Sequence, residues 1–285
     1  MKKIIISPNK SKDPLYKYTD MVLSELSKYG AALCMSKQHE KIADGRVRYI
    51  DGDELYAGAD LLIVLGGDGS ILEAARQAAI YSIPILGVNL GRVGYMAALE
   101  IEELDLLSGL FDGNYTIDER MMLNAYVQHP DGSEEWMLPV LNEIVLTRGT
   151  LSRMIDIELF CADELAGKYR VDGLIFATPT GSTAYNMSAG GPVVDPSLDA
   201  VTVTPVCPHS PNSRPMVFGG ASCFTAKYTG NADGKWYVTA DGRDNLELAF
   251  ADTVNISKSE HVTKLLNLKS NGFYDVLRRK TSEKQ

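Results

Sequence analysis

A run of five apolar residues that leads directly into a glycine-rich turn constrains the fold of this chain most strongly. Leu61–Leu65 contains no polar residue, which is typical of a strand buried on both faces of a sheet. Gly66-Gly67-Asp68-Gly69-Ser70 follows at once, and the residues from Ser70 to Tyr81 have helical periodicity. A strand, a short turn and a helix in this order predict a parallel sheet that is covered by helices.

The segments on either side continue this alternation. Ile4–Ser7 and Pro84–Val88 each indicate a short buried strand. Asp13-Pro14 suits the start of a helix, and Gly30 suits its end. The apolar residues that we expect on the buried face of this helix are Leu15, Tyr18, Val22, Leu26 and Tyr29.

The pattern changes after Glu100. A short helix is expected over Glu103–Phe111, and β-rich or alternating segments follow it. His129–Ser133 has the composition of a hairpin turn, and a tail over Val262–Lys280 is expected to end in a helix. The expected strands are Asn124–Gln128, Trp136–Leu146, Ile155–Cys161, Leu174–Ala177, Ala200–Val206, Ser222–Lys227, Trp236–Thr239 and Leu246–Phe250.

Composition excludes several classes of protein. The chain has 285 residues, a formal net charge of −9 and a pI near 5.0, which argues against general binding to nucleic acids or membrane surfaces. Its four cysteines and four histidines lack the spacing of a zinc site or a redox pair. The apolar run at Ile4–Ile6 is too short for a signal peptide, and no stretch reaches membrane-spanning length. We therefore expect a cytoplasmic protein.

The turn at 66–70 lies at the sheet edge where ligands of α/β proteins bind. Its glycines allow close approach of a ligand to the backbone, and the first helical turn favours anions. It is neither a P-loop, since no lysine follows the glycines, nor a GxGxxG dinucleotide fingerprint. From the residues alone, an ordinary tight turn with Asp68 as a capping residue is about equally plausible.

Two other stretches carry polar groups suited to a nucleotide. In the stretch from Tyr169 to Pro192, a strand runs into hydroxyl residues and a short helix, on which Ala184, Tyr185 and Ser188 share a face. These three could border a flat ring with hydrogen-bonding edges, or Tyr185 could belong to the core of a capped loop. Asn142-Glu143 interrupts an apolar run and needs partners if it is buried, although a strand end that faces water is the simpler interpretation.

Together and in this order, these stretches resemble the NAD kinase family over nearly the whole chain. A lone GGDG also occurs in diacylglycerol-kinase-like lipid kinases and in phosphofructokinases, whereas TPTGSTAY at 178–185 is far more specific. Arg243 departs from the family pattern, in which glutamine is expected. An arginine there could pair with a carboxylate or contact a phosphate, so the role of the loop 239–243 stays open, although its residues alone favour a turn. The matching stretches are Gly66–Gly69, Asn89–Tyr95, Asn142-Glu143, Val171–Gly173, Thr178–Tyr185 with Ser188–Gly191, Pro208-His209 through Arg214-Pro215, and Phe273-Tyr274 to Arg279-Lys280.

The resemblance implies a fold and an activity. The fold would be a doubly wound α/β domain at 1–114, joined by the returning tail at about 260–285, and a β-sandwich-like NAD-binding domain at 115–259. The enzyme would transfer the γ-phosphate of ATP to the 2′-hydroxyl of the adenosine ribose of NAD, with a divalent metal such as Mg²⁺. Relatives form dimers or tetramers in which subunits share the dinucleotide site.

The resemblance also implies roles for individual residues. Asp68 would be the base for the 2′-hydroxyl and would orient metal and phosphate, while Asp172 would contact the nicotinamide end from a neighbouring subunit. No residue is assigned as a dedicated metal ligand. The remaining implied site residues are Gly66, Gly67 and Gly69 in the phosphate loop, Asn142 and Glu143 on the dinucleotide, Ala184 and Tyr185 at the ring pockets, Ser188 on adenine, Thr183 as a polar contact and Arg170 on phosphate.

Three other activities stay open at this point. A GGDG kinase could act on a lipid or a sugar phosphate, although the pI near 5.0 gives a lipid surface little support. A sensor could bind NAD or NADP without catalysis, but the presence of Asp68 argues against it. An NADP 2′-phosphatase usually has an additional domain, for which this chain has no room.

Overall fold

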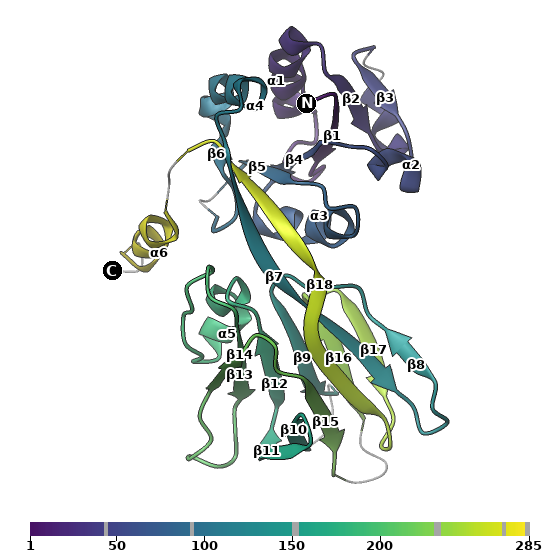
Figure 1. Cartoon of the computed structure of the whole chain (residues 1–285), viewed down its shortest axis with the longest axis vertical. Helices are drawn as coiled ribbons and strands as arrows, with labels where there is room; N and C mark the ends of the chain where they lie inside the picture. Colours follow the sequence, from purple (N-terminus) through teal and green to yellow (C-terminus); the bar gives the residue numbers. More distant parts are fainter. Residues whose placement is uncertain (43–44, 92–93, 150–153, 231–234, 270–271, 283–285) are drawn as a thin grey trace. The chain divides into compact units, whose positions relative to one another are not determined.

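The computed structural model describes residues 1–42, 45–91, 94–149, 154–230, 235–269 and 272–282. The chain divides into two compact units (Figure 1). Unit 1 comprises Met1–Glu119 and Thr263–Gln285, and unit 2 comprises Arg120–Val262. The tail of the chain thus belongs to the same unit as its beginning.

Unit 1 is built on a parallel sheet with the strand order β3-β2-β1-β4-β5. The end of β18 adds to it, since Leu265 pairs in parallel with Ile85 of β5. All six residues of β4 are buried, as the apolar run predicted. The strands are β1 (Lys3–Pro8), β2 (Ala32–Met35), β3 (Val47–Tyr49), β4 (Leu61–Gly66), β5 (Ile85–Asn89), the short β6 (Leu99–Glu100) and β18 (Thr253–Asn267).

Helices cover both faces of this sheet (Figure 1). Val22 and Leu26 of α1 pack with Ile63 of β4 in one core. On the other face Ile71 of α3 lies over β5, so closely that a Cβ atom at Gly87 would be 2.5 Å from Ile71 Cδ1. This confirms the doubly wound α/β class. The helices are α1 (Lys17–Leu26), α2 (Asp53–Tyr56), α3 (Asp68–Ile80), α4 (Gly109–Asp112) and α6 (Phe273–Ser282), with 3₁₀ turns η1 (Ser27–Tyr29), η2 (Lys37–Ile42) and η3 (Ile101–Ser108).

The first helix begins later than its sequence predicted. It starts at Lys17 rather than at Asp13-Pro14, because Tyr16 has a left-handed backbone with φ of 55°. Asp13 still caps the helix, but from a distance: its carboxylate accepts hydrogen bonds from the Thr19 amide (2.8 Å) and hydroxyl (2.7 Å). Leu15, which we expected on the buried face, is 88% exposed.

Unit 2 is a sandwich of two antiparallel layers, as predicted. One layer is a six-stranded sheet with the order β14-β13-β12-β9-β16-β17. Phe176 and Trp236 from this layer share a core with Leu159 and Phe224 from the other, and the rings of Phe176 and Phe224 are 5.5 Å apart. The six strands are β9 (Glu143–Arg148), β12 (Gly173–Ala177), β13 (Ala200–Val206), β14 (Met216–Gly219), β16 (Trp236–Ala240) and β17 (Asp244–Leu248). The other layer contains β7 (Thr116–Gln128), β8 (Glu134–Trp136), β10 (Ile155–Cys161), β11 (Glu164–Val171), β15 (Phe224–Tyr228) and β18, and the turns η4 (Gly181–Thr183) and α5 (Tyr185–Ser188) follow β12.

Two expectations for the strands were wrong in part. The predicted strand Trp136–Leu146 is divided, since β8 ends at Trp136 and β9 begins at Glu143. The amides of 141–143 bond instead to the side chain of Asp241, which keeps this segment out of the ladder. The tail, for which only a terminal helix was expected, begins within the 15-residue strand β18.

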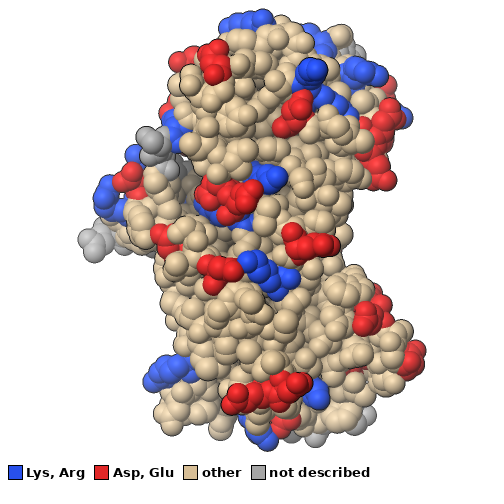
Figure 2. Space-filling model, viewed as in Figure 1, with Lys and Arg blue, Asp and Glu red and all other residues tan. Residues whose placement is uncertain are grey.

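The mixture of charges on the surface and the length of the helices agree with what the composition predicted. On the face drawn in Figure 2, lysine and arginine side chains are interspersed with aspartate and glutamate side chains. No helix in the described part of the chain has the length and apolar character needed to cross a membrane.

Candidate functional site

Asp68 stands at the first position of α3, where β4 has just ended. Its carboxylate accepts hydrogen bonds from the amides of Tyr95 (2.8 Å) and Met96 (3.1 Å). The side chain remains 30% exposed, so it is fixed in position and still open to a ligand. A carboxylate with these properties can accept a proton from a bound hydroxyl.

The glycines near Asp68 serve different purposes. A Cβ atom at Gly94 would overlap with the Asp68 carboxylate, and one at Gly66 would overlap with the Ser70 side chain. Gly69 belongs to the first turn of α3, and among the described residues no atom lies within 4 Å of a Cβ built there. Close approach to Asp68 therefore depends on Gly94, which lies in the matching stretch 89–95; Arg92 and Val93 of that stretch lie outside the described residues.

The C-terminal helix brings a cation to the same carboxylate. Lys280 Nζ lies 3.7 Å from Asp68 Oδ2 and 4.1 Å from the centre of the Tyr95 ring. Phe273, at the start of α6, packs near Tyr95 with a ring separation of 6.2 Å. Burial and the nearby Asp68 raise the pKa of Tyr95. The sequence resemblance included this tail, but nothing in its residue pattern indicated which side chain reaches Asp68.

A second lysine reaches the glycine turn from the loop after β1. Lys12 Nζ lies 2.6 Å from the position of a Cβ at Gly67 and 3.4 Å from one at Gly91. Sequence reasoning had noted that no lysine follows the glycines, as it does in a P-loop. The structure supplies a lysine from a distant segment, so a search for the local motif could not have found it.

The other group of predicted residues borders a cavity of about 600 Å³ in unit 2. Glu143, Asp172 and Tyr185 line it, which brings together three separate motifs. Tyr185 is 45% exposed, so it is not a core residue. The other residues described in the lining are Val145, Thr147, Arg148, Gly149, Gly173, Val206, Cys207, Thr239 and Gly242.

Glu143 has an unusual environment in this cavity. It is only 8% exposed, and its Oε2 atom has no hydrogen-bond partner among the described residues. Burial and the nearby Asp241 raise the pKa of Glu143 to about 8, although the Tyr185 amide opposes the shift. A buried polar atom without a partner is costly, so a ligand group that bonds to it would be held strongly.

Asp241 holds the Asn142-Glu143 segment in place. Its carboxylate accepts hydrogen bonds from the amides of Leu141 (3.0 Å), Asn142 (2.9 Å) and Glu143 (3.0 Å). Asp241 is 6% exposed and has a positive φ of 49°. Sequence reasoning treated 239–243 as a turn and missed this role; an aspartate before glycine gave no signal beyond turn formation.

The hydroxyl-rich stretch packs directly against the same segment. Thr178 donates a hydrogen bond to the Leu141 carbonyl (2.6 Å), and its amide donates to the Asn142 carbonyl (2.9 Å). A Cβ atom at Gly181 would overlap with the backbone of Asn142. The two motifs therefore form one structure, in which the 178–185 turn orients Asn142 and Glu143.

Apart from Asp172, the remaining predicted residues are not part of the described lining of the cavity. Ala184 precedes α5, and Tyr185 and Ser188 are three positions apart on that single helical turn. Asp172 forms an ion pair with Arg148 (2.7 Å), while Arg170 Nε is 3.9 Å from Asp156 on the neighbouring strand. The described lining of the cavity does not include Asn142, Arg170, Thr183, Ala184 or Ser188.

Among the described residues, Asp68 is the side chain that best suits a divalent metal bound together with substrate phosphates. No group of three metal-binding side chains occurs among the residues that the structure describes. Mg²⁺ is commonly bound through one or two carboxylates together with substrate phosphates, and Asp68 is a fixed, partly exposed carboxylate of that kind. The residues thus suit an ion that arrives with a phosphorylated ligand.

Comparisons with known proteins match both parts of the chain to the same family. The profile of the ATP-NAD kinase N-terminal domain matches residues 4–115, and that of the ATP-NAD kinase C-terminal domain matches residues 141–268. The chain is 37% identical to the NAD kinase of Caldanaerobacter subterraneus subsp. tengcongensis over 289 residues, which covers 100% of both chains. It is 38% identical to that of Clostridium perfringens (strain 13 / Type A) over 283 residues, which covers 98% of each.

Two solved structures share the fold. Yeast NADH kinase complexed with NADH has a TM-score of 0.90 at 20% identity, with 99% of this chain and 88% of that chain covered. An NAD kinase from Archaeoglobus fulgidus in complex with ATP has a TM-score of 0.75 at 23% identity, with 98% of each chain covered.

Proposed function

Because the chain belongs to the ATP-NAD kinase family, its reaction is the phosphorylation of NAD, and we propose that Asp68 is the residue that activates the acceptor hydroxyl. The observation that supports this role best is the position of the Asp68 carboxylate. Two backbone amides hold it at the end of β4, and Gly94 leaves it room.

The proposed reaction transfers the γ-phosphate of ATP to the 2′-hydroxyl of the adenosine ribose. The bond from the 2′-oxygen to phosphorus forms, the bond from phosphorus to the β-phosphate oxygen breaks, and the hydroxyl proton passes to Asp68. Phosphoryl transfer depends mainly on positioning and on the stabilisation of charge. Lys12 and Lys280 supply positive charge near the glycine turn and near Asp68.

A divalent metal would be held by Asp68 and by the phosphates of the donor. When bound, it would neutralise phosphate charge and so offset the repulsion from the carboxylate. The chain itself sets the orientation of the Asp68 carboxylate, because two backbone amides hold it before any ligand arrives.

The cavity of unit 2 is proposed to hold NAD. Glu143 Oε2 is a buried atom that needs a partner, and a ribose hydroxyl can both donate and accept a hydrogen bond. Tyr185 offers a partly exposed ring at the cavity wall. Roles for Asn142, Thr183, Ala184, Ser188 and Arg170 stay predictions from the family resemblance.

We also propose, on the family resemblance alone, that the protein works in the cytoplasm as a dimer or tetramer with Asp172 reaching a neighbouring subunit's ligand. Analytical ultracentrifugation tests the assembly, since a monomer at micromolar concentration would contradict it.

Incubation with ATP-Mg²⁺ and alternative acceptors tests the activity. NAD should yield NADP, whereas diacylglycerol and fructose 6-phosphate should yield no product. A folded protein that phosphorylates either of those acceptors but not NAD would contradict the proposed function. Tight NAD binding without NADP formation would instead indicate a sensor.

A further inference from the structure

The short helix α5 carries Tyr185 at the wall of the unit 2 cavity, although its own sequence holds it weakly. It consists of a single turn, and an isolated helix of this length is not stable in water. Ala184 at its N-terminus supplies no side-chain cap. Within α5, Asn186 is the one buried residue, whereas Tyr185, Met187 and Ser188 are exposed. The position of Tyr185 therefore depends on what Asn186 contacts.

All the hydrogen-bonding capacity of the Asn186 side chain is used within the protein. The residue is 0% exposed. Its amide nitrogen donates to the carbonyls of Ser182 (3.1 Å) and Pro192 (2.9 Å). Its oxygen accepts from the hydroxyls of Thr204 (2.6 Å) and Thr202 (3.2 Å). A primary amide has two N–H donors and two lone pairs on its oxygen, so these four contacts leave nothing for a ligand.

These bonds tie both ends of the α5 segment to the sheet. Ser182 lies before the helix and Pro192 after it, so one amide group bridges the segment 182–192. Thr202 and Thr204 lie on β13, which pairs with β12, the strand that leads into this segment. Loss of the Asn186 side chain would therefore release α5 from the strand beside it.

The packing around the Asn186 amide leaves little free space. A Cβ atom at Gly191 would lie 2.1 Å from Asn186 Oδ1, so a glycine is needed there. Ser182 adds a parallel connection, since its hydroxyl donates to the Pro179 carbonyl (2.6 Å) and accepts from the Val194 amide (3.0 Å). Buried polar contacts thus hold most of the segment in place.

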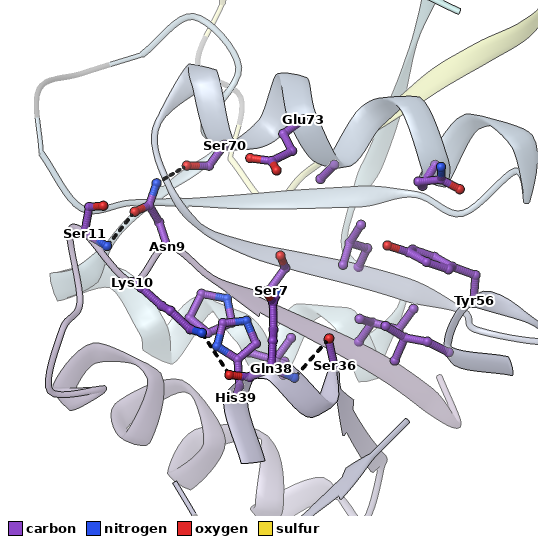
Figure 3. Close-up of a pocket in the computed structure, with 17 residues that line it drawn as sticks. Ser7, Asn9, Lys10, Ser11, Ser36, Gln38, His39, Tyr56, Ser70 and Glu73 are labelled. Atoms are coloured by element: carbon purple, nitrogen blue, oxygen red, sulfur yellow. Dashed lines mark hydrogen bonds between the residues drawn. The ribbon is translucent and has the colours of Figure 1, made fainter. Parts of the chain in front are cut away.

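Asn9 in unit 1 illustrates an asparagine that holds a turn and still faces a cavity. Its side chain donates to the Ser70 hydroxyl (2.8 Å) and accepts from the Ser11 amide (3.0 Å) (Figure 3). Asn9 is half-buried and lines a cavity of about 480 Å³. Asn186 is different, because the described lining of the unit 2 cavity does not include it. It can act on a ligand only through its neighbours.

Tyr185, the neighbour of Asn186, meets the cavity in two ways. Its side chain lines the wall, and the residue is 45% exposed. Its amide is a hydrogen-bond donor to the Glu143 carboxyl group. Glu143 is the buried residue proposed above to bind a ribose hydroxyl. A displacement of α5 would therefore disturb the Tyr185 ring and the Glu143 contact together.

We propose that Asn186 is a positioning residue for the phosphorylation of NAD, because it holds α5 so that the ring and the amide of Tyr185 face the dinucleotide. The proposal rests on the proposed function, since it requires that the cavity of unit 2 holds NAD. It assigns Asn186 no contact with either substrate.

Thr204 allows the network to be opened with little change of shape. Thr204→Val removes the hydroxyl that donates to Asn186, whereas Thr204→Ser keeps it. Asn186→Ala removes the amide group itself. Thr225→Val is the matched control, because the Thr225 hydroxyl donates to the Asn255 side-chain oxygen (2.8 Å) in the other layer of unit 2, and Thr225 does not line the described part of the cavity. Circular dichroism and thermal melting identify any variant that has not folded.

Steady-state kinetics with NAD and ATP-Mg²⁺ measure the effect on each substrate. Thr204→Val should raise the KM for NAD by about 3–10-fold, and Asn186→Ala should raise it at least ~10-fold. The KM for ATP should not change, and kcat should stay within about twofold of the wild type, because the lost interaction is one of binding. Thr204→Ser should restore the KM for NAD, and Thr225→Val should leave it unchanged.

Two results would overturn the proposal. One is a wild-type KM for NAD in Thr204→Val, and the other is an equal rise of that KM in Thr225→Val, which would indicate general destabilisation. Should Asn186→Ala fail to fold, Thr204→Val still decides it.

A double-mutant cycle tests whether Asn186 acts through Tyr185. In the Tyr185→Ala background the ring is absent, so adding Thr204→Val should raise the KM for NAD by a smaller factor than it does in the wild type. The same factor in both backgrounds would show that the two residues act independently and would overturn the proposal.

Calorimetric titration with NAD distinguishes a failure of this inference from a failure of the proposed function. If the wild type forms NADP and Thr204→Val keeps the wild-type KM for NAD, the positioning role is wrong and the activity stands. If the wild type binds NAD but forms no NADP, the proposed function fails, and weaker NAD binding by Thr204→Val would still support the role of Asn186. A wild type that binds no NAD would contradict both.

Discussion

At the scale of single residues, the candidate site depends on carboxylates whose surroundings differ. Asp68 is partly exposed and held by two amides, which suits a group that must meet a substrate. Glu143 is buried with one oxygen atom unpartnered, and Asp241 is buried with three amide partners. These surroundings support three different roles: we propose reaction for Asp68 and ligand binding for Glu143, while Asp241 supports the backbone.

The raised pKa of Glu143 predicts a dependence of stability on pH. Between its ordinary pKa of 4.5 and its folded-state pKa of about 8, the folded protein binds more protons at this site than the unfolded chain. Its contribution to stability therefore falls as pH rises through this range. Glu143→Gln should gain stability relative to wild type between pH 5.5 and pH 9, by on the order of 3 kcal/mol.

Chemical denaturation at several pH values measures this difference. A constant difference between the two proteins from pH 5.5 to pH 9 would contradict the assigned environment of Glu143. Above about pH 8, where Glu143 is ionised and both of its oxygen atoms accept hydrogen bonds, the same variant should bind NAD more weakly, because the amide nitrogen of glutamine accepts none.

At the scale of the elements, the site forms where turns pack against strand ends. The 178–185 turn is fixed to the start of β9 through Thr178 and Gly181, and the loop after β16 is fixed to it through Asp241. In unit 1, α6 meets the loop before β6 through Lys280 and Tyr95. Each functional side chain is therefore positioned by an element distant from it in sequence.

Gly181→Ala tests the junction in unit 2. Its methyl group would overlap with the Asn142 backbone, which cannot rotate away as a side-chain tip can. We expect a loss of about 1–3 kcal/mol in stability and weaker NAD binding. Gly219→Ala is the matched control, because no described atom lies within 4 Å of its Cβ position. Equal melting temperatures for the two variants would exclude the close packing.

Lys280→Ala tests the contact made by α6. The ion pair with Asp68 is about one-third exposed, so its loss should change stability by less than about 1 kcal/mol. The loss of positive charge at the reacting group should nevertheless lower kcat by about 10–100-fold. Arg278→Ala on the same helix is the control, since Arg278 bonds to Asp275 (2.6 Å) on the surface. Equal kcat values in the two variants would show that the positive charge of Lys280 has no part in the reaction.

At the scale of the whole molecule, the sequence predicted local patterns well and distant contacts poorly. The apolar run at Leu61–Leu65 became β4, Ile155–Cys161 and Ala200–Val206 became strands with the same bounds, and the α/β and sandwich classes were right. These features follow from periodicity within a few residues. The strand β18 was missed because its polar and apolar residues alternate within what looked like a tail.

The site could be predicted only as far as its motifs are continuous in sequence. Gly66 to Asp68 and Asn142-Glu143 stood out as local patterns. The role of Asp241 could not be seen, because its partners lie about 100 positions earlier in the chain. Lys12 and Lys280 reach the glycine turn and Asp68 by folding, and a single lysine in a polar stretch carries no signal of that contact.

The most direct test of the account is the turnover number of Asp68→Asn in a coupled assay of NADP formation from NAD and ATP-Mg²⁺. The amide keeps the size of the side chain and removes the proton acceptor, so kcat should fall by at least ~10²–10⁴-fold while the protein stays folded. Asp112→Asn, which changes an exposed aspartate of α4, should retain wild-type turnover. Turnover of Asp68→Asn close to that of the wild type would contradict the central role of Asp68.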